Sequence, residues 1–217
     1  MNSLNGVMVV GLTGQTGAGK STVSKVFAAN GFAIINADVV ARKVVEKGTE
    51  CLAEIEDLFG SEIINSDGTL NRKALGNIVF SDKKKLEMLN TITYPYITGE
   101  ILREIRMHSI KGEKLILLDA PTLFESRADD FCELIISVLA DDDTREMRII
   151  KRDGLTSEQA RKRMNSQLDE EFFISHSDYI INNNQTIETV NEISKEVSDK
   201  IKDYYHTKVN PAEQTAI

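Results

Sequence analysis

Short runs of apolar residues recur along the chain, and longer stretches with helical spacing separate them. The central runs are continuous rather than alternating, which is typical of parallel strands that are covered on both faces. Strands that alternate with helices predict an α/β fold with right-handed crossovers. The five expected core strands are residues 7–12, 33–36, 114–119, 134–139 and 178–182.

Two intervals between the expected strands are too long for simple crossovers. Residues 41–111 show helical apolar spacing in 44–59 and 86–108, with a turn at 65–68 between them. Residues 143–175 are rich in arginine, and the capping-box spacings Asp143–Glu146 and Thr156–Gln159 predict two helix starts there. We therefore expect an acceptor-binding domain at 41–111 and a mobile lid at 143–175. The core would comprise 1–40, 112–142 and 176–206, with a last helix at 187–205 and a flexible tail at 207–217.

The first expected strand leads into the phosphate-binding pattern G-x-x-x-x-G-K-S/T, which runs from Gly14 to Ser21. A strand, a Gly-rich loop and a helix in this order argue against a chance glycine turn. Glycines let backbone N–H groups point at phosphate oxygens, and the helix adds its positive N-terminal end. Lys20 is expected to reach the β- and γ-phosphates, and the Ser21 hydroxyl to hold Mg²⁺. The nucleotide-contacting residues expected here are Gly14, Gly17, Ala18, Gly19, Lys20, Ser21 and Thr22.

The composition narrows the possible partners. A length of 217 residues allows one sizeable core, and a net charge of −8 argues against a broad nucleic-acid or anionic-membrane surface. An anion site must then be built locally, from Lys20 and a few arginines. Cys51 and Cys132 lack metal-ligand spacing and are expected to be buried free thiols. Neither a signal peptide nor a membrane span is expected, so the pattern favours a soluble, cytoplasmic protein, and we expect a monomer.

Carboxylates follow two of the expected strands, at the sheet edge where ligands of α/β proteins bind. Asp38 could accept a proton from an acceptor hydroxyl, or it could cap a helix that begins near Val39. Arg42, one turn further on, could contact a substrate phosphate or pair with Asp38. Asp119 ends the third strand, where an Asp commonly supports Mg²⁺ in phosphate-loop proteins. Glu125 either lies near this site or is simply solvated.

Arginines and glutamines of the expected lid fall on two helical faces. These faces comprise Arg145, Arg148 and Arg152, and Gln159, Arg163 and Gln167. A charged face is usually just solvated, yet phosphoryl transfer by an acidic protein needs guanidinium groups to neutralise developing charge. Arg152 and Arg163 are the leading candidates, ahead of Arg148. The three histidines are scattered, and we assign them no role.

At this point the chain resembles the dephospho-coenzyme A kinase family, over nearly its whole length to about Tyr205. The phosphate loop is widely shared among proteins, whereas the blocks 37–42 and 67–72, in this order, are far more specific. The resemblance also rests on Leu89-Asn90 with Pro95, on 121–125, on the lid pattern from Arg145 to Gln167, and on 177–184.

The resemblance implies a three-layer α/β/α fold of the P-loop kinase type, with a five-stranded parallel sheet, a helical substrate-binding insertion and a helical lid. It implies ATP-dependent phosphorylation of the ribose 3′-hydroxyl of dephospho-CoA, with Mg²⁺, as the last step of CoA biosynthesis. Asp38 would meet that hydroxyl, residues 44–108 would bind the CoA portion, and Asn183 would lie near the adenine of ATP.

Several positions depart from the family pattern. Asn36 stands where the family usually has Asp, Tyr94 replaces a His before the proline, Gln15-Thr16 replaces Gly-Ile, and Gln185 replaces Gly. None of these changes removes Lys20, Ser21 or Asp38. Two other functions fit the residues: another small-molecule kinase of the same fold, and a nucleotide-binding regulator without turnover. A regulator would not need Asp38, so catalysis is the favoured interpretation.

Overall fold

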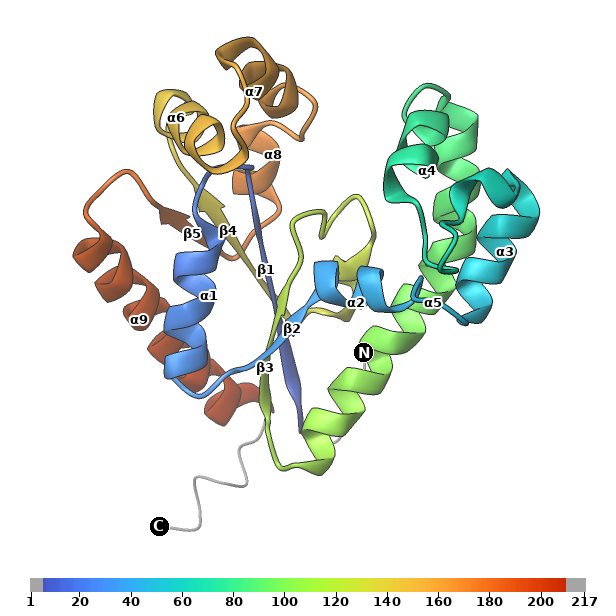
Figure 1. Ribbon diagram of the computed structural model, residues 1–217. Coiled ribbons are helices and arrows are strands. Elements are labelled where there is room, and N and C mark those ends of the chain that lie inside the picture. Colours follow the sequence, from blue (N-terminus) through green and yellow to red (C-terminus); the bar gives the residue numbers. More distant parts are fainter. Residues whose placement is uncertain (1–5, 210–217) are drawn as a thin grey trace. The chain divides into compact units, whose positions relative to one another are not determined.

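A computed structural model of the chain describes residues 6–209 (Figure 1). The chain divides into two compact units. Residues up to Ile35 and from Arg106 onward form the first unit, and Asn36–Ile105 forms the second. No helix among the described residues is long and apolar enough to cross a membrane.

The first unit is built on a five-stranded sheet, in the order β2-β3-β1-β4-β5. Its strands are β1 (Met8–Gly14), β2 (Ala33–Asn36), β3 (Leu115–Asp119), β4 (Leu134–Leu139) and β5 (Tyr179–Asn182). β1 pairs in parallel with both β3 and β4, and β4 pairs in parallel with β5. All five predicted strands and the α/β class are confirmed. β1 continues two residues beyond the predicted end, so its last residue is the first residue of the phosphate loop.

Two helices, α1 (Lys20–Ala29) and α9 (Ile187–Tyr204), lie side by side over one face of the sheet (Figure 1). Phe27 of α1 and Ile201 of α9 are fully buried in one cluster with Leu12 of β1. Burying each such side chain contributes about 1.5–3 kcal/mol to folding. On β1, a Cβ atom at Gly11 would come within 2.8 Å of Leu123, so a glycine lets the segment after β3 pack directly on the strand.

The insertion after β4 contains α6 (Asp142–Asp153), α7 (Ser157–Met164) and α8 (Glu170–Ser175). The predicted capping box of Thr156 and Gln159 is confirmed at the start of α7. The predicted helix start at Asp143 is wrong, because α6 begins at Asp142 with Asp141 at its N-cap. Asn184 fixes this earlier start: it accepts from the backbone N–H of Asp141 and donates to its carboxylate, each at 2.8 Å.

The C-terminal part of the first unit follows the prediction closely. The helix expected at 187–205 is confirmed as α9 and continues as a π-helix, Tyr205–Val209. The expected flexible tail falls largely on residues 210–217, which lie outside the described residues. Cys51 and Cys132 are free thiols, as predicted; Cys51 is buried, whereas Cys132 is only partly so.

The second unit consists of helices and a turn. Its helices are α2 (Ala37–Lys43), α3 (Glu50–Phe59), α4 (Arg72–Val79) and most of α5 (Lys83–Ile110), with a short 3-10 turn at Ser61–Ile63. The helix expected from residue 44 begins only at Glu50, because Thr49 caps it and Gly48 adopts a φ of 85°. The predicted turn at 65–68 is confirmed: the N–H of Gly68 donates to the carbonyl of Asn65 at 2.9 Å.

Candidate functional site

The phosphate loop leaves the end of β1 and enters α1 through glycines that closely approach their neighbours. A Cβ atom at Gly14 would lie 2.2 Å from the carbonyl oxygen of Val138, and one at Gly19 would lie 2.2 Å from the amide nitrogen of Asn183. Gly19 is the N-cap of α1 in a left-handed conformation, and no side chain caps the helix. The N-terminal end of α1 is therefore available to an anion.

Two of the predicted site residues lie beside each other at the loop. The ammonium of Lys20 lies 3.8 Å from a carboxylate oxygen of Asp119, and both side chains are largely buried. Ser21 follows Lys20 in the first turn of α1 and is exposed. The start of α1 thus supplies the ammonium of Lys20 and the hydroxyl of Ser21, and the carboxylate of Asp119 lies beside that ammonium.

Side chains from the predicted lid region hold the phosphate loop through its backbone. Gln167 accepts from the N–H of Thr16 at 2.7 Å, and Arg145 donates to the Thr16 carbonyl at 3.1 Å. Arg148 donates to the carbonyls of Gly17 and Ala18 at 3.4 and 3.2 Å. The sequence placed these three side chains on helical faces and made Arg148 a weaker candidate for charge stabilisation, but their contacts with the loop were missed.

Arg145 is not part of a solvated face. Only 3% of the residue is exposed, and its guanidinium also pairs with Asp142 at 2.9 Å. Burial lowers the pKa of Arg145 from its usual value. Because its bonds run to the loop backbone and to its own helix, Arg145 supports the loop structurally.

Asn183 lies directly against the phosphate loop. The residue is buried, and its side-chain amide donates to the carbonyl of Ala18 at 2.7 Å. Its own carbonyl accepts from Arg148 at 3.0 Å. Asn183 therefore joins the end of β5 to the loop, and the adenine contact implied by the family resemblance stays a prediction.

The two leading candidates of the lid, Arg152 and Arg163, meet at one carboxylate. Arg152 donates twice to Asp153, each time at 2.8 Å, and Arg163 donates to the same carboxylate at 2.8 Å. Both arginine side chains are about half exposed, at 56% and 50%. The structure thus brings these two residues together, whereas Arg145 and Arg148 are arginines that contact the phosphate loop.

In the second unit, the capping role considered for Asp38 is wrong. β2 ends at Asn36 and α2 begins at Ala37, so the side chain of Asn36 caps the helix by accepting from Val39. Asp38 and Arg42 are both exposed. Within residues 6–209, neither side chain forms a hydrogen bond or an ion pair, so the alternative in which they pair with each other is not supported.

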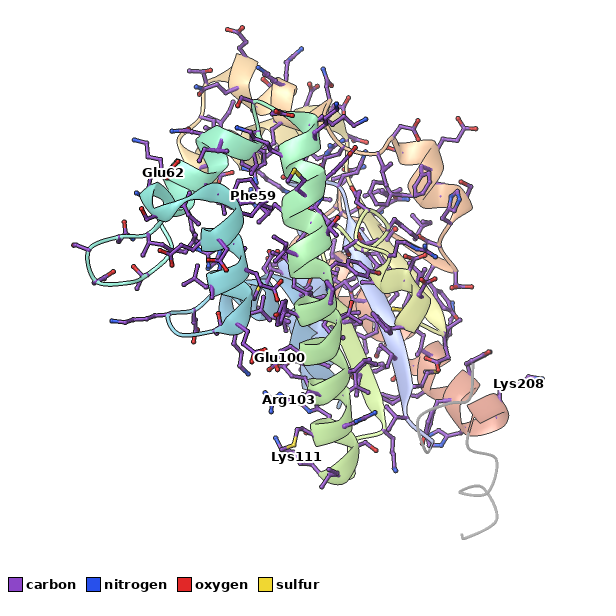
Figure 2. All side chains as sticks on the ribbon, turned by 90° about the vertical axis from the view of Figure 1, so that its right-hand side faces the viewer. Phe59, Glu62, Glu100, Arg103, Lys111 and Lys208 are labelled. Carbon is purple, nitrogen blue, oxygen red and sulfur yellow. The ribbon has the colours of Figure 1, made fainter. Side chains whose placement is uncertain are left out.

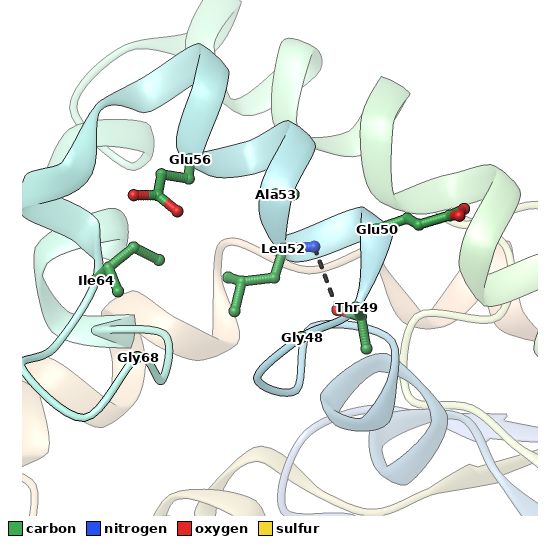
Figure 3. Close-up of a pocket in the computed structure, with 8 residues that line it drawn as sticks. All are labelled: Gly48, Thr49, Glu50, Leu52, Ala53, Glu56, Ile64 and Gly68. Atoms are coloured by element: carbon green, nitrogen blue, oxygen red, sulfur yellow. Dashed lines mark hydrogen bonds between the residues drawn. The ribbon is translucent and has the colours of Figure 1, made fainter.

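A pocket of about 350 Å³ lies wholly within the second unit (Figure 3). Leu52, Ala53 and Ile64 give it apolar lining, and Glu50 and Glu56 contribute carboxylates. Its volume falls at the lower end of the range for small-molecule sites. Thr49 is already engaged in capping α3, since it accepts from the N–H of Leu52 at 3.3 Å. This lining suits an uncharged chain with hydrogen-bond donors better than a phosphate.

A parallel sheet whose central strand feeds a phosphate loop, with a helical insertion that carries arginines, defines the class of P-loop kinases. Residues 8–189 match the family model described as dephospho-CoA kinase. The chain therefore belongs to the dephospho-CoA kinase family.

Relatives in distant organisms support the family assignment. The chain is 44% identical over 179 residues to dephospho-CoA kinase of Listeria innocua, which covers 82% of this chain and 90% of the relative. It is 41% identical to dephospho-CoA kinase of Oryza sativa, over 87% of this chain and 82% of the relative. A solved dephospho-CoA kinase from Campylobacter jejuni superposes with a TM-score of 0.68 at 27% identity, covering 89% of this chain and 96% of that one.

Proposed function

We propose that this protein transfers the γ-phosphoryl group of ATP to the ribose 3′-hydroxyl of dephospho-CoA, giving CoA and ADP in the last step of CoA biosynthesis. One observation carries the proposal: this chain, which belongs to the family, has an intact phosphate loop with Lys20 beside Asp119 at the start of α1. In the reaction, the hydroxyl oxygen attacks the γ-phosphorus while the bond to the β–γ bridging oxygen breaks.

The loop would bind the triphosphate of ATP through its backbone and through Lys20. The proposed contacts are Gly14, Gly17, Ala18, Gly19, Lys20, Ser21 and Thr22, with Asn183 near the adenine. An uncapped helix start favours bound anions, and a lysine neutralises charge that develops on the phosphates. Catalysis would then consist mostly of positioning and charge stabilisation.

The residues near Lys20 fit Mg²⁺. Ser21 and Asp119 offer a hydroxyl and a carboxylate, which are the oxygen donors that this hard cation prefers. Within residues 6–209, no group of three or more His, Cys, Asp or Glu could hold a metal ion. This agrees with Mg²⁺, which is usually held by one or two protein groups together with waters and substrate phosphates. Bound Mg²⁺ would supply charge neutralisation at the β- and γ-phosphates.

Asp38 would act on the acceptor. Its exposed carboxylate, which does not cap α2, is free to take the proton of the 3′-hydroxyl as that oxygen attacks. Arg42, one turn further along α2, would bind a phosphate of dephospho-CoA. The pocket between Gly48 and Gly68 would receive the uncharged amide chain of the same molecule.

The lid would complete the site. Arg152 and Arg163 would stabilise charge on the transferring phosphoryl group, and closure of residues 143–175 would exclude water as a competing acceptor. The proposal assigns residues 41–111 to acceptor binding and 1–40, 112–142 and 176–206 to the nucleotide-binding core. We further propose that the protein acts as a monomer in the cytoplasm.

A comparison of acceptors tests this function. Initial rates with MgATP are measured for dephospho-CoA, adenosine, AMP and a simple sugar at equal concentrations. We expect dephospho-CoA to be phosphorylated with a kcat/KM at least about 1,000-fold above the others, within the range that a site hydrogen-bonding its substrate can achieve. A preference for a nucleoside would establish a different small-molecule kinase, and binding of ATP without transfer to any acceptor would establish a regulator.

A further inference from the structure

We propose that Asp153 is a positioning residue for phosphoryl transfer: it holds Arg152 and Arg163, which come from different helices, in one arrangement that faces the transferring group. This inference rests on the proposed function and deepens its account of the lid. Asp153 ends α6, whereas Arg163 lies in the last turn of α7. One carboxylate therefore links the two helices that carry the candidate arginines.

The contacts of Asp153 fix the arginines without using up their donors. Arg152 gives two N–H groups to the carboxylate and Arg163 gives one. A guanidinium has five N–H donors. Within the described part of the chain, neither guanidinium has a hydrogen-bond partner besides Asp153, so the remaining side-chain N–H groups of both are available to phosphate oxygens.

Two exposed arginines that lie near each other need a carboxylate partner that binds both of them. Their side chains have many rotamers, and their like charges repel. The two arginines lower the pKa of Asp153, first through the hydrogen bond from Arg152, so the carboxylate stays ionised at neutral pH. An ionised carboxylate between the guanidiniums reduces their repulsion and limits their rotamers.

The chain offers a matched control on the same pair of helices. Glu146 of α6 accepts from Arg161 of α7 at 2.9 Å and from Ser157 at 2.5 Å. Like Asp153, it joins α6 to α7 through an arginine, but Arg161 has no proposed role in catalysis. Removing either carboxylate therefore breaks a similar link between the helices, while only the loss of Asp153 releases Arg152 and Arg163.

The test compares Asp153→Asn and Glu146→Gln in the full chain with MgATP and dephospho-CoA. We expect Asp153→Asn to lower kcat about 10-fold, since misplaced catalytic groups lose much of their effect, with both KM values within about 2-fold. Glu146→Gln should stay within about 2-fold of wild type. Both variants should melt within about 3 °C of wild type, because the arginine of each ion pair is at least half exposed and such pairs contribute little. Asp153→Glu, which keeps the charge, should recover most of the activity.

A second comparison, in a variant that lacks both arginines, distinguishes failure of this inference from failure of the proposed function. With both Arg152 and Arg163 replaced by Ala, Asp153→Asn should cause no further loss, since it acts through them. A further 10-fold loss there, or equal effects of Asp153→Asn and Glu146→Gln in the wild-type background, would overturn the inference and leave the proposed function intact. Full activity of the alanine variants would instead remove the lid arginines from the proposed function.

A structural readout independent of turnover completes the test. The side-chain N–H resonances of Arg152 and Arg163 should be dispersed in the wild type and in Glu146→Gln. In Asp153→Asn they should collapse to the positions of freely solvated arginines. Unchanged resonances in Asp153→Asn would overturn the proposal that this carboxylate orders the guanidiniums.

Discussion

The side-chain oxygen of Asn36 accepts a hydrogen bond from the backbone N–H of Val39 at 3.0 Å and thereby caps α2. The exposed carboxylate of Asp38 lies inside the first turn of the same helix. Asn36 and Asp38, two positions apart in the sequence, thus have separate roles. Because Asn36 caps α2, the effect of this segment on stability and the effect of Asp38 on activity can be tested separately.

Replacing Asp38 with Asn should remove activity and spare the fold. An amide cannot take the proton of the acceptor hydroxyl, so kcat should fall by at least about 100-fold. The free energy of unfolding should change by less than about 1 kcal/mol, the size of one charge interaction with the helix dipole. Steady-state kinetics and thermal unfolding of the same preparation measure both effects.

Replacing Asn36 with Ala, unlike replacing Asp38 with Asn, should lower the stability of the protein. Loss of the cap should lower the free energy of unfolding by about 1 kcal/mol. Asn36→Asp, which keeps a capping oxygen, serves as the control and should unfold like the wild type. If Asp38→Asn unfolds at a lower temperature than the wild type but keeps the same kcat, Asp38 has a structural role and its assignment as the base is wrong.

Replacing Lys20 with Ala should abolish phosphoryl transfer and weaken triphosphate binding, because the ammonium is placed to neutralise phosphate charge. Lys25→Ala, at an exposed position on the same helix, is the matched control and should behave as wild type. Circular dichroism checks that both variants fold, and calorimetric titration with ATP measures binding. Near-wild-type turnover of a folded Lys20→Ala variant would contradict the phosphate-loop mechanism.

Replacing Asn183 with Ala should destabilise the phosphate loop. The substitution removes one of two donors to the carbonyl of Ala18, since Arg148 still donates to it, and should cost about 1 kcal/mol. Affinity for ATP should fall as well, since the loop loses a fixed contact beside Gly19. Asn182→Ala, at the exposed neighbouring position, should have little effect on either measurement. Equal behaviour of the two variants in denaturant titration and ATP binding would refute this role.

Stability in acid should depend on Glu100 of α5, which Figure 2 shows close to Arg103. The hydrogen bond from Arg103, followed by that from Lys43, lowers the pKa of Glu100 from 4.5 to about 2. A lowered pKa in the folded state means that the carboxylate stabilises the protein above pH 4.5 and loses this effect as the pH falls towards 2. The wild type should therefore be more stable than Glu100→Gln at pH 7, and the difference should shrink across this window.

Thermal unfolding of the wild type and Glu100→Gln between pH 2 and 7 measures this difference. Glu104→Gln is the control, because among residues 6–209 its carboxylate makes only the longer contact to Lys43, at 3.8 Å. A stability difference for Glu100→Gln that stays constant with pH would show that the carboxylate acts through packing rather than charge.

The sequence predicts the sheet and the phosphate loop because both depend on local patterns. Continuous apolar runs such as 134–139 can be buried only as strands or short helices, and a loop that follows β1 needs its glycines at fixed positions. The start of α2 was harder to predict, because Asn and Asp cap helices about equally well. From the sequence we considered only Asp38 as the cap; the end of β2 at Asn36 places the cap two residues earlier.

Contacts between the insertion after β4 and the phosphate loop could not be predicted because they join residues far apart in the chain. Thr16 and Gln167 are 151 positions apart, and helical periodicity does not say what a face packs against. One signal was present: Ile149, a buried residue, follows Arg148 directly and lies one turn after Arg145. An apolar residue one turn away on the same face is consistent with the burial of Arg145, but this spacing does not distinguish Arg148 from the exposed Arg152.

The central claim is that this protein phosphorylates the 3′-hydroxyl of dephospho-CoA. The most direct measurement incubates the purified wild type with MgATP and dephospho-CoA, and identifies the product by mass spectrometry and phosphorus NMR. We expect one new phosphate monoester on the ribose 3′-oxygen, formed together with an equal amount of ADP, and none with Lys20→Ala. Recovery of unchanged dephospho-CoA from a reaction at saturating substrate concentrations would contradict this claim. A phosphate on any other oxygen would contradict it as well.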